Sequence, residues 1–424
     1  MRQRWSNWSG GQQAHPDFLQ PRNLDDLKKI VLKHDKIRMV GAGHSFSPLA
    51  KTDDVMINLD HIQGVHNFDE RKNQCTLYAG TRLYKLGECL APIHQALQNQ
   101  GDIDHQSLAG VVATGTHGTG VDLPCLSALV AGFELLTAQG DVLHCSPEQN
   151  AEIFEAGRVA LGSLGSLGIM TKITLQNRPR YKLKEHMRLC ALNDIYQYID
   201  RWKHQHRHIE FWAFLHSDQV ILKTLDESRG LTEPRPQHWL SEDRLLTFCS
   251  EMTRLFPALN PYLQSLLGVF IKPSTHVDWS NQIFPTPRNT KFNEMEYQLP
   301  AEQGLACLQE LLAVLKKQRV AMFFPIEFRY VKGDDIWLSP FYGRDSVSIS
   351  IHQFYKQDCQ HVFKWVEPIL QKYQGRPHRG KLHTLQANQL RELYPKWDDF
   401  MQLRQRLDSE QKWMNPHLTE LFLH

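Results

Sequence analysis

The sequence of 424 residues has almost no net charge and no long apolar run. Lys and Arg number 48 and Asp and Glu number 46, so the formal net charge is +2. This balance gives no reason to expect nucleic acid as the partner, because such proteins attract phosphates with an excess of positive charge. No stretch approaches the ~20 consecutive apolar residues of a spanning helix. The polar first residues also lack the apolar core of a secretory signal.

Paired cysteines are missing as well. The eight cysteines are scattered and form no C-x-x-C pair, which is typical of reduced thiols rather than of a disulfide framework or a structural zinc site. Hydrophobic residues make up 41% and charged residues 22%, the ordinary proportions of a folded globular protein. At ~150 residues per domain, the length predicts two or three domains. We therefore expect a cytoplasmic, multi-domain enzyme.

Short β-rich runs and helical stretches mix along the chain. Apolar spacing with Asn23 as N-cap predicts a helix over 24–33, and Pro92 should kink or split a second candidate over 83–98. Alternation and β-branched content predict strands at 37–40, 55–59, 169–175, 209–214 and 347–351. A helix is expected over 305–318, a polar loop over 226–238 and a mostly helical end over 385–423. This mixture predicts the α+β class.

The first glycine-rich segment, Gly41-Ala42-Gly43-His44-Ser45, directly follows a predicted strand. Its glycines let the backbone approach a phosphate closely. The segment starts like a dinucleotide fingerprint, but Phe46 stands at the third glycine position and Pro48 interrupts the crossover helix. Taken alone, it indicates a tight turn with a surface histidine. An NAD-dependent dehydrogenase, which would be colourless, is the rival that this motif raises.

Two further glycine-rich segments follow. Between Thr114 and Gly120 every residue except His117 is glycine or threonine, so the segment offers N–H groups and hydroxyls that can wrap a pyrophosphate. The third segment, Gly-Ser-Leu-Gly-Ser-Leu-Gly over 162–168, runs into the strand predicted from Ile169. Each of these segments, considered separately, could also be a glycine-rich turn at the corner of a sheet, with a structural role only.

In order and spacing, these segments match one family. The sequence resembles the vanillyl-alcohol-oxidase-type FAD oxidoreductases, in particular the aldonolactone oxidases and alditol oxidases. The resemblance covers most of the chain and is carried by Asn7-Trp8-Ser9-Gly10, the segments 41–45, 113–120 and 162–168, Glu327-Phe328-Arg329, Trp337-Leu338-Ser339-Pro340, His378-Arg379-Gly380-Lys381, Leu393-Tyr394-Pro395 and Asn415. It implies an α+β fold in which 1–178 and 376–424 form a two-part, PCMH-type FAD-binding domain. Residues 179–375 would form a mixed-sheet cap or substrate domain.

The resemblance also implies how the cofactor is held. His44 stands where the family joins a histidine covalently to the flavin C8α methyl group, which implies covalent FAD. The cofactor-binding residues that it implies are Gly41, Ala42, Gly43, His44, Ser45, Asp102, Ser107, Gly110, Thr114, Gly115, Thr116, His117, Gly118, Gly165, Gly168 and Ile169.

A second set of residues is expected on the substrate side of the flavin. Glu327 and Arg329 lie two apart on a probable strand, so their side chains point to one face. The arginine can stabilise a reduced flavin or hold a substrate oxygen, and the glutamate can accept hydrogen bonds from hydroxyls. A surface ion pair is the alternative interpretation. Lys381 and His378 match the family's H-W-G-K motif, and we expect His352 to join them as catalytic residues.

Three departures from the family pattern affect the substrate assignment. Arg379 replaces the tryptophan of H-W-G-K, and Asp102 stands where alditol oxidases carry a serine. Ser350 stands where they carry a histidine, and His352 on the same strand face could substitute for it. These changes weaken the transfer of substrate identity and leave the flavin chemistry intact.

Alternating histidines at 204, 206 and 208 could be read as metal ligands on a strand. They lie among arginines and lysines, and a cationic surrounding opposes a metal ion. We therefore predict a solvated surface segment and no metal site.

The predicted activity is that of a FAD-dependent oxidase. Hydride would pass from a CH–OH carbon of a sugar-derived substrate to flavin N5, and reoxidation by O2 would give H2O2. An aldono-1,4-lactone of the arabinono- or gulonolactone type is the leading substrate. An alditol, or a dehydrogenase that uses another electron acceptor, is the alternative. At Gly101 a small residue would leave room for O2, which favours the oxidase. A non-catalytic binding module is the rival from another class, against which the intact His44 and Lys381 argue.

Overall fold

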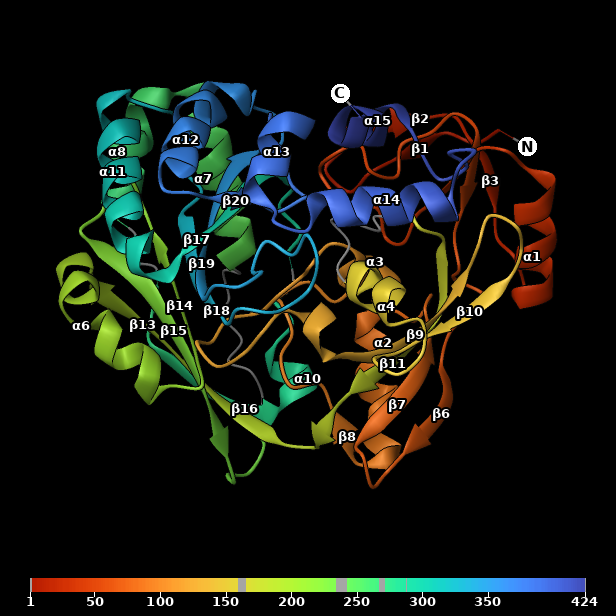
Figure 1. Cartoon of the computed structure of the whole chain (residues 1–424). Helices are drawn as coiled ribbons and strands as arrows, with labels where there is room; N and C mark the ends of the chain where they lie inside the picture. The colour runs from red at the N-terminus through yellow and green to blue at the C-terminus, as the bar shows by residue number, and fades with distance from the viewer. Residues whose placement is uncertain (1, 159–164, 234–241, 267–270, 287, 424) are drawn as a thin grey trace.

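The computed structural model describes residues 2–158, 165–233, 242–266, 271–286 and 288–423, and two large sheets dominate it (Figure 1). The first is five-stranded, in the order β10 (Val142–Cys145), β9 (Val130–Leu136), β11 (Ile169–Gln176), β7 (Gln74–Tyr78) and β6 (Val65–Asp69). A three-stranded parallel sheet also belongs to the N-terminal part and has the order β3 (Asp17–Leu19), β5 (Val55–Ile57) and β4 (Ile37–Met39).

The second large sheet is eight-stranded and starts where the first ends in sequence. Its order is β16 (Ser274–Trp279), β13 (Lys182–Ala191), β15 (Gln219–Ser228), β14 (His208–Ala213), β18 (Ile326–Val331), β19 (Ser346–Phe354), β17 (Phe292–Pro300) and β20 (Arg376–Pro377). The α+β class is confirmed. The pairings between these strands are all antiparallel, where a mixed sheet was predicted. An antiparallel sheet can be covered on one face and polar on the other.

Helices flank both sheets. They are α1 (Leu24–Lys33), α2 (Leu83–Leu90), α3 (Leu108–Ala113), α4 (Ala151–Gly157), α6 (Leu192–Gln205), α7 (Glu242–Leu255), α8 (Asn260–Ser265), α10 (Ser280–Ile283), α11 (Gly304–Lys317), α12 (Gln360–Lys372), α13 (Ala387–Leu393), α14 (Trp397–Leu407) and α15 (Pro416–Leu423). The short strand pairs β1 (Trp5–Ser6) with β2 (Gln13–Ala14), and β8 (Gln95–Ala96) with β12 (Arg178–Pro179), complete the fold.

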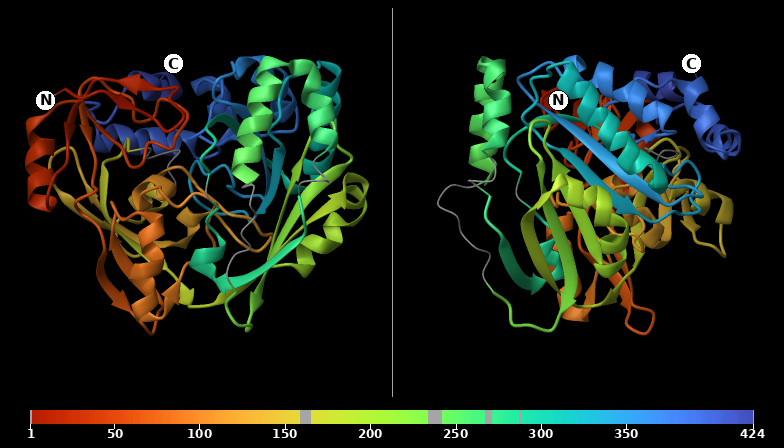
Figure 2. Two further views of the ribbon diagram at one scale, coloured as in Figure 1. Left: turned by 180° about the vertical axis from the view of Figure 1, so that it is seen from behind. Right: turned by 90° about the vertical axis from the view of Figure 1, so that its left-hand side faces the viewer.

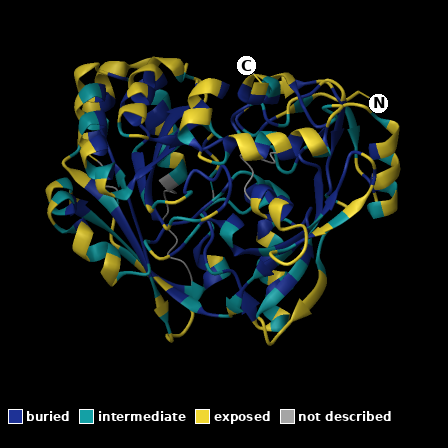
Figure 3. Cartoon of the chain, in the orientation of Figure 1, coloured by how far each residue is buried: buried dark blue, intermediate teal, exposed yellow. Residues whose placement is uncertain are grey.

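The two faces of the eight-stranded sheet differ in polarity around strand β18. Alternate residues of β18, such as Ile326, Phe328 and Tyr330, are buried. Their face continues in the neighbouring strands and is covered by α6, α11 and α12 (Figure 2). The residues between them, Glu327 and Arg329, belong to the opposite face, which carries most of the charged side chains of the sheet. In Figure 3 the central strands of the eight-stranded sheet are largely buried, whereas the outer surfaces of the helices are exposed.

The C-terminal segment returns to the N-terminal part of the chain, and both termini lie on the same side of the molecule (Figure 1). The Ile37 amide donates to the Lys412 carbonyl at 3.0 Å, and the Asn415 side-chain amide donates to the Pro48 carbonyl at 2.9 Å. The Phe46 amide donates to the Gly380 carbonyl at 2.7 Å. The division into 1–178, 179–375 and 376–424 stays a prediction.

Several local predictions can be compared directly with the structure. The helix over 24–33 is confirmed as α1, and the Asn23 side chain accepts a hydrogen bond from the Asp26 amide at 2.8 Å. The second helix ends at Leu90, Pro92 lies in a 3-10 turn over Ala91–Ile93, and the chain then enters β8, so the predicted split is confirmed. The loop predicted over 226–238 is wrong in its first part, because pairing with β13 extends β15 to Ser228. Residues 234–238 lie outside the described residues.

The alternating histidines do not form the solvated surface segment that we predicted. His204 is exposed, but His206 Nδ1 contacts Asp226 Oδ2 at 2.7 Å. His208 is buried, because β14 begins there and turns the ring against Phe284 at 5.4 Å between centroids. Within the described ranges no group of three or more His, Cys, Asp or Glu residues is arranged to hold a metal ion.

No helix in the part of the chain that the structure describes is long and apolar enough to cross a bilayer. The cytoplasmic location stays a prediction.

Candidate active site

One large cavity, of about 1190 Å³, is lined by the glycine-rich segments and by the polar face of the eight-stranded sheet. Ligand pockets for small molecules measure roughly 300–1,000 Å³, so this volume has room for a large cofactor beside a small substrate. The sequence-predicted residues that line it are Gly41, Ala42, Gly43, His44, Ser45, Asp102, Ser107, Gly110, Thr114, Thr116, His117, Gly165, Gly168, Ile169, Glu327, Arg329, His352, His378 and Lys381. Gly115 and Gly118 are not among the lining residues. Residues 162–164 of the third glycine-rich segment lie outside the described residues.

At two glycines of the cavity wall there is no space for a side chain. A Cβ atom at Gly41 would lie 2.2 Å from Ser107 Oγ, the oxygen that caps α3 by accepting from the Gly110 amide. Gly168 has φ +150°, and a Cβ there would lie 2.7 Å from the Leu136 carbonyl oxygen. Bare backbone therefore lines this part of the cavity, which is what close approach of a dinucleotide requires. The residues present fit FAD.

His44 lies in the wall beside this glycine segment. Its ring stacks on Trp8 with centroids 5.4 Å apart and planes inclined by 27°. Burial, together with the nearby His105 and the Lys381 charge, lowers the pKa of His44 to about 4. The ring is therefore neutral at neutral pH, and one of its nitrogens keeps a free electron pair.

The turn over 378–381 closes the cavity next to Ser45. The Gly380 amide donates to His378 Nδ1 at 3.1 Å, and burial lowers the pKa of His378 to about 4. The side chain of Arg379 does not line the cavity and instead lies over the ring of Tyr394, 5.4 Å from its centroid. The replacement of the family's tryptophan by Arg379 therefore adds no charge to the cavity wall.

Lys381 extends from this turn to two glutamates of β17 that the sequence analysis missed. Its Nζ forms an ion pair with Glu294 and lies 3.6 Å from Glu296 Oε2. His352 Nε2 lies 3.5 Å from the other oxygen of Glu294. Burial alone would raise the pKa of Glu294, but the Lys381 and His352 charges hold it at about 2.

Glu296 also connects the Gly-Thr segment to the sheet. His117 Nδ1 contacts the Gly118 carbonyl at 2.8 Å, and because a carbonyl only accepts, Nδ1 carries the proton. The other ring nitrogen contacts Glu296 Oε1 at 2.7 Å. The same oxygen accepts from Gln298 Nε2 at 2.7 Å and Ser348 Oγ at 2.9 Å. This buried network fixes His117 in one orientation.

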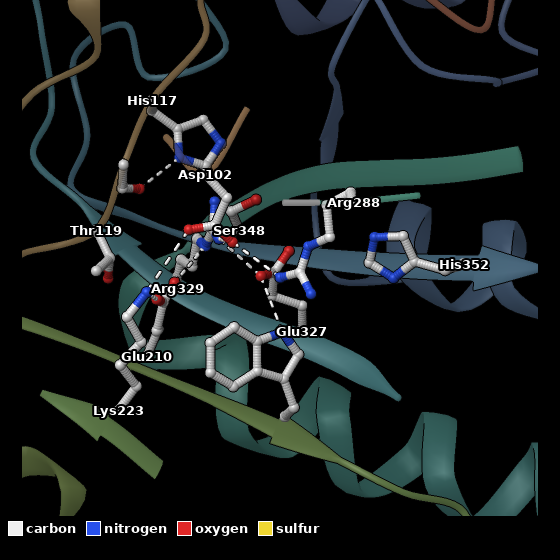
Figure 4. Close-up of polar contacts among 12 residues, drawn as sticks. Asp102, His117, Thr119, Glu210, Lys223, Arg288, Glu327, Arg329, Ser348 and His352 are labelled. Carbon is white, nitrogen blue, oxygen red and sulfur yellow. Dashed lines mark hydrogen bonds and ion pairs between the residues drawn. The ribbon is translucent and has the colours of Figure 1, made fainter. Parts of the chain in front are cut away.

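The densest charge cluster surrounds Arg329 (Figure 4). Its Nε donates to Glu210 at 2.6 Å, while its Nη2 lies 2.8 Å from Asp102 and 2.7 Å from Glu327. Glu327 also accepts from Trp212 Nε1 at 3.0 Å. The pair is buried at the cavity wall, so the alternative of a surface ion pair is wrong.

Asp102 belongs to the same cluster, although it comes from the N-terminal part of the chain. Besides Arg329, it contacts Arg288 at 3.0 Å and Lys223 at 3.7 Å. Burial would raise the pKa of Asp102, and the three cations hold it far below its usual range. Its cofactor-binding role stays a prediction.

Glu327 differs from Asp102, Glu294 and Glu296 in the direction of its pKa shift. Burial raises the pKa of Glu327, Arg329 partly offsets this rise, and the negative charge of Asp102 adds to it. A carboxylate with a raised pKa is a better proton acceptor near neutral pH than an ordinary surface glutamate.

The residues missed by sequence reasoning were Glu210, Lys223, Arg288, Glu294 and Glu296. A signal existed for the two glutamates of β17, which alternate with the buried Met295 and Tyr297. Charged side chains at every second position of an otherwise apolar strand indicate a polar face that is enclosed by the fold.

Comparison with known proteins agrees with this architecture. The chain resembles a solved structure of a solvent-stable cholesterol oxidase, with a TM-score of 0.82 and 16% identity over 100% of this chain and 98% of the other, which shows the fold. The FAD binding domain family matches residues 17–146. The D-arabinono-1,4-lactone oxidase family matches residues 173–421, and the chain belongs to this family. It is a FAD-dependent oxidoreductase, and the resemblance on which we based the predictions is confirmed.

Two full-length relatives are informative. The L-gulono-1,4-lactone dehydrogenase of Mycobacterium tuberculosis is 36% identical over 423 residues, 97% of each chain. The L-gulonolactone oxidase of Mus musculus is 30% identical over 437 aligned positions, covering 99% of this chain and 98% of the mouse protein.

Proposed function

We propose that this chain oxidises a CH–OH group of a sugar 1,4-lactone, with FAD as its cofactor. The observation that carries the proposal is the buried Glu327, held by Arg329 and Trp212 in the wall of a cavity that is also lined by glycine backbone. The two full-length relatives are named for L-gulono-1,4-lactone and L-gulonolactone. A relative that matches over about half of its length is named for D-arabinono-1,4-lactone, and these names together support the lactone class.

When bound, FAD would supply the acceptor for the hydride, which carries both electrons. The chain's own residues then have three tasks. Glu327 takes the hydroxyl proton at its carboxylate, for which its raised pKa suits it. Arg329 fixes that carboxylate and supplies positive charge to oxygens of the substrate. Lys381, with its own pKa raised by Glu294 and Glu296 against the effect of burial, keeps a positive charge at the other end of the polar face.

A substrate panel tests this function. Purified enzyme is mixed without O2 with five- and six-carbon sugar 1,4-lactones and, separately, with open-chain sugar alcohols, and the bleaching of the flavin is followed. We expect rapid bleaching with lactones. Bleaching by the alcohols alone would favour the alditol oxidase alternative, and no bleaching with either class would overturn the proposal.

The attachment of FAD through His44 is a separate proposal. The neutral ring, which keeps a free electron pair, and its position in the cavity wall support it. After acid precipitation we expect the yellow colour to stay with the wild-type pellet and to appear in the supernatant for His44→Ala. The matched variant His105→Ala changes the histidine next to His44 and should keep its colour in the pellet. Colour in the wild-type supernatant would contradict the covalent link.

We propose O2 as the electron acceptor, because Gly101 lines the cavity without a side chain. A Cβ there would lie 3.0 Å from the His117 carbonyl oxygen, so Gly101→Ala narrows the space at this point. We expect the variant to be reduced by lactone at the wild-type rate and reoxidised by O2 more slowly. Equal reoxidation rates would contradict this role. A wild-type enzyme that reacts only with dye acceptors would be a dehydrogenase, as the mycobacterial relative is named.

A further inference from the structure

Arg288 is held over the cavity by a loop that is anchored on both sides. Before it, the Thr286 amide donates to the Asp102 carbonyl at 3.0 Å. After it, the amides of Asn289 and Thr290 donate to Asp243 Oδ1 at 3.1 and 3.0 Å. Arg288 itself lines the cavity, and its Nη2 donates to Asp102 Oδ2 at 3.0 Å.

Three cations contact Asp102, and they differ in exposure and in how many other carboxylates they bind. Lys223 is 6% exposed and Arg329 12% exposed, and both also bind Glu210. Arg288 is 32% exposed, and among the hydrogen bonds of the described residues it uses only Nη2, toward Asp102. Its other N–H donors are therefore available to a ligand in the cavity.

The position of Arg288 relative to the other charged groups indicates which part of a bound molecule it would contact. Figure 4 shows its guanidinium next to Glu327. A molecule whose hydroxyl reaches Glu327 therefore lies within the surroundings of Arg288. A planar guanidinium with one nitrogen fixed on a carboxylate still presents paired donors, which suit a carbonyl oxygen or two neighbouring hydroxyls.

We infer that Arg288 is a substrate-binding residue that donates hydrogen bonds to a carbonyl or hydroxyl oxygen of the sugar lactone, away from the carbon that is oxidised. This inference depends on the proposed function. Asp102 acts as its positioning residue, because it fixes the guanidinium through Nη2 and holds the loop through its own carbonyl.

The test separates binding from chemistry. Flavin bleaching is measured without O2 at increasing lactone concentration, which yields a dissociation constant and a limiting rate. For Arg288→Ala we expect the dissociation constant to rise about ten- to a hundred-fold, as for a lost charged hydrogen bond, with the limiting rate within about three-fold of wild type. Arg288→Lys keeps a cation for Asp102 without the planar fork, so weak binding should persist.

The matched control is Arg254→Ala. Arg254 is 35% exposed, pairs with Glu251 at 2.7 Å and does not line the cavity, so its loss should leave the dissociation constant unchanged. Wild-type affinity in Arg288→Ala would overturn the inference. So would wild-type affinity in Arg288→Lys, which would reduce the role to neutralising Asp102. If Arg288→Ala fails to fold, Arg288→Lys decides. If lactones do not bleach the wild-type enzyme, the proposed function fails and this inference with it.

Discussion

The two faces of strand β18 place opposite demands on neighbouring residues. Phe328 is fully buried on the helix-covered face and stacks on Phe211 with centroids 4.7 Å apart. Glu327 and Arg329, on either side of it in sequence, face the cavity and contact charged partners from other strands and loops. The first face is satisfied by any side chain of suitable shape, whereas the second requires particular chemical groups in particular positions.

This difference shows where the fold and the chemistry are encoded. Hydrophobic burial stabilises a protein in proportion to area and depends little on identity. Buried ion pairs often contribute little net stability, because desolvation offsets their attraction. A cluster such as Asp102, Glu210, Lys223 and Arg329 is therefore better explained by its function than by its contribution to stability. Substitutions on the two faces should then separate stability from activity.

The largest effect is expected from Glu327→Gln. The amide still accepts from Trp212 but cannot take a proton, so the rate of flavin reduction by lactone should fall about 10²–10⁴-fold. The unfolding temperature should change little. Anaerobic stopped-flow measurement checks the rate, and a loss smaller than ten-fold would remove Glu327 from its proposed role.

Phe328→Ala, one residue away, should do the reverse. Removing this ring from the fully buried face should lower the free energy of unfolding by about 3–5 kcal/mol. The reduction rate per FAD-loaded molecule should stay within a few-fold of wild type. Urea unfolding measures the first quantity, and Phe328→Leu serves as the milder control. An activity loss as large as that of Glu327→Gln would erase the distinction between the faces.

The polar face should contribute stability only where its carboxylates are ionised. Because the pKa of Glu294 is held at about 2, below its ordinary value of 4.5, its contribution is fully present above pH ~4.5 and is lost as pH falls toward 2. The shift corresponds to about 3 kcal/mol. Unfolding free energy measured over this range should decline more gently in Glu294→Gln. If the unfolding free energies of wild type and Glu294→Gln decline in parallel, the lowered pKa of Glu294 is contradicted.

The smallest effect is expected outside the sheet. Asn23→Ala removes the N-cap of α1 and should cost about 1 kcal/mol of unfolding free energy without changing activity. Asn23→Asp keeps the capping oxygen and should restore stability. Asn23→Ala thus tests whether a small loss of stability far from the cavity leaves activity unchanged. An equal loss of stability in Asn23→Ala and Asn23→Asp would exclude a capping effect.

Much of the fold could be predicted because its signals are local. Asn23 and the apolar spacing behind it define α1, and Pro92 marks the end of α2 within two residues. The end of β15 could not be predicted, because Asp226 to Ser228 are strand only through their pairing with β13. Polar composition alone indicated a loop there.

The residues of the candidate site also fall into those that local sequence predicts and those that only the fold brings together. The glycine-rich segments and the pair Glu327 and Arg329 are short motifs that can be recognised in sequence. Lys223 and Arg288 have no such motif, because they meet Asp102 only through the register of the sheet and the anchoring of a loop. The charged environment of Glu327 therefore had to be read from the three-dimensional arrangement.

The return of the C-terminal segment has a consequence for biosynthesis. Ser47 donates its hydroxyl to the Arg379 carbonyl across 332 residues of sequence. A ribosome adding ~5–20 residues per second needs on the order of tens of seconds to make that much chain. During this time the segment around His44 has its N-terminal contacts, such as the Trp8 amide on the Gly43 carbonyl, but lacks those to Arg379 and Gly380. We therefore expect FAD to be loaded late in synthesis, and a product terminated before residue 379 to lack this side of its cofactor site.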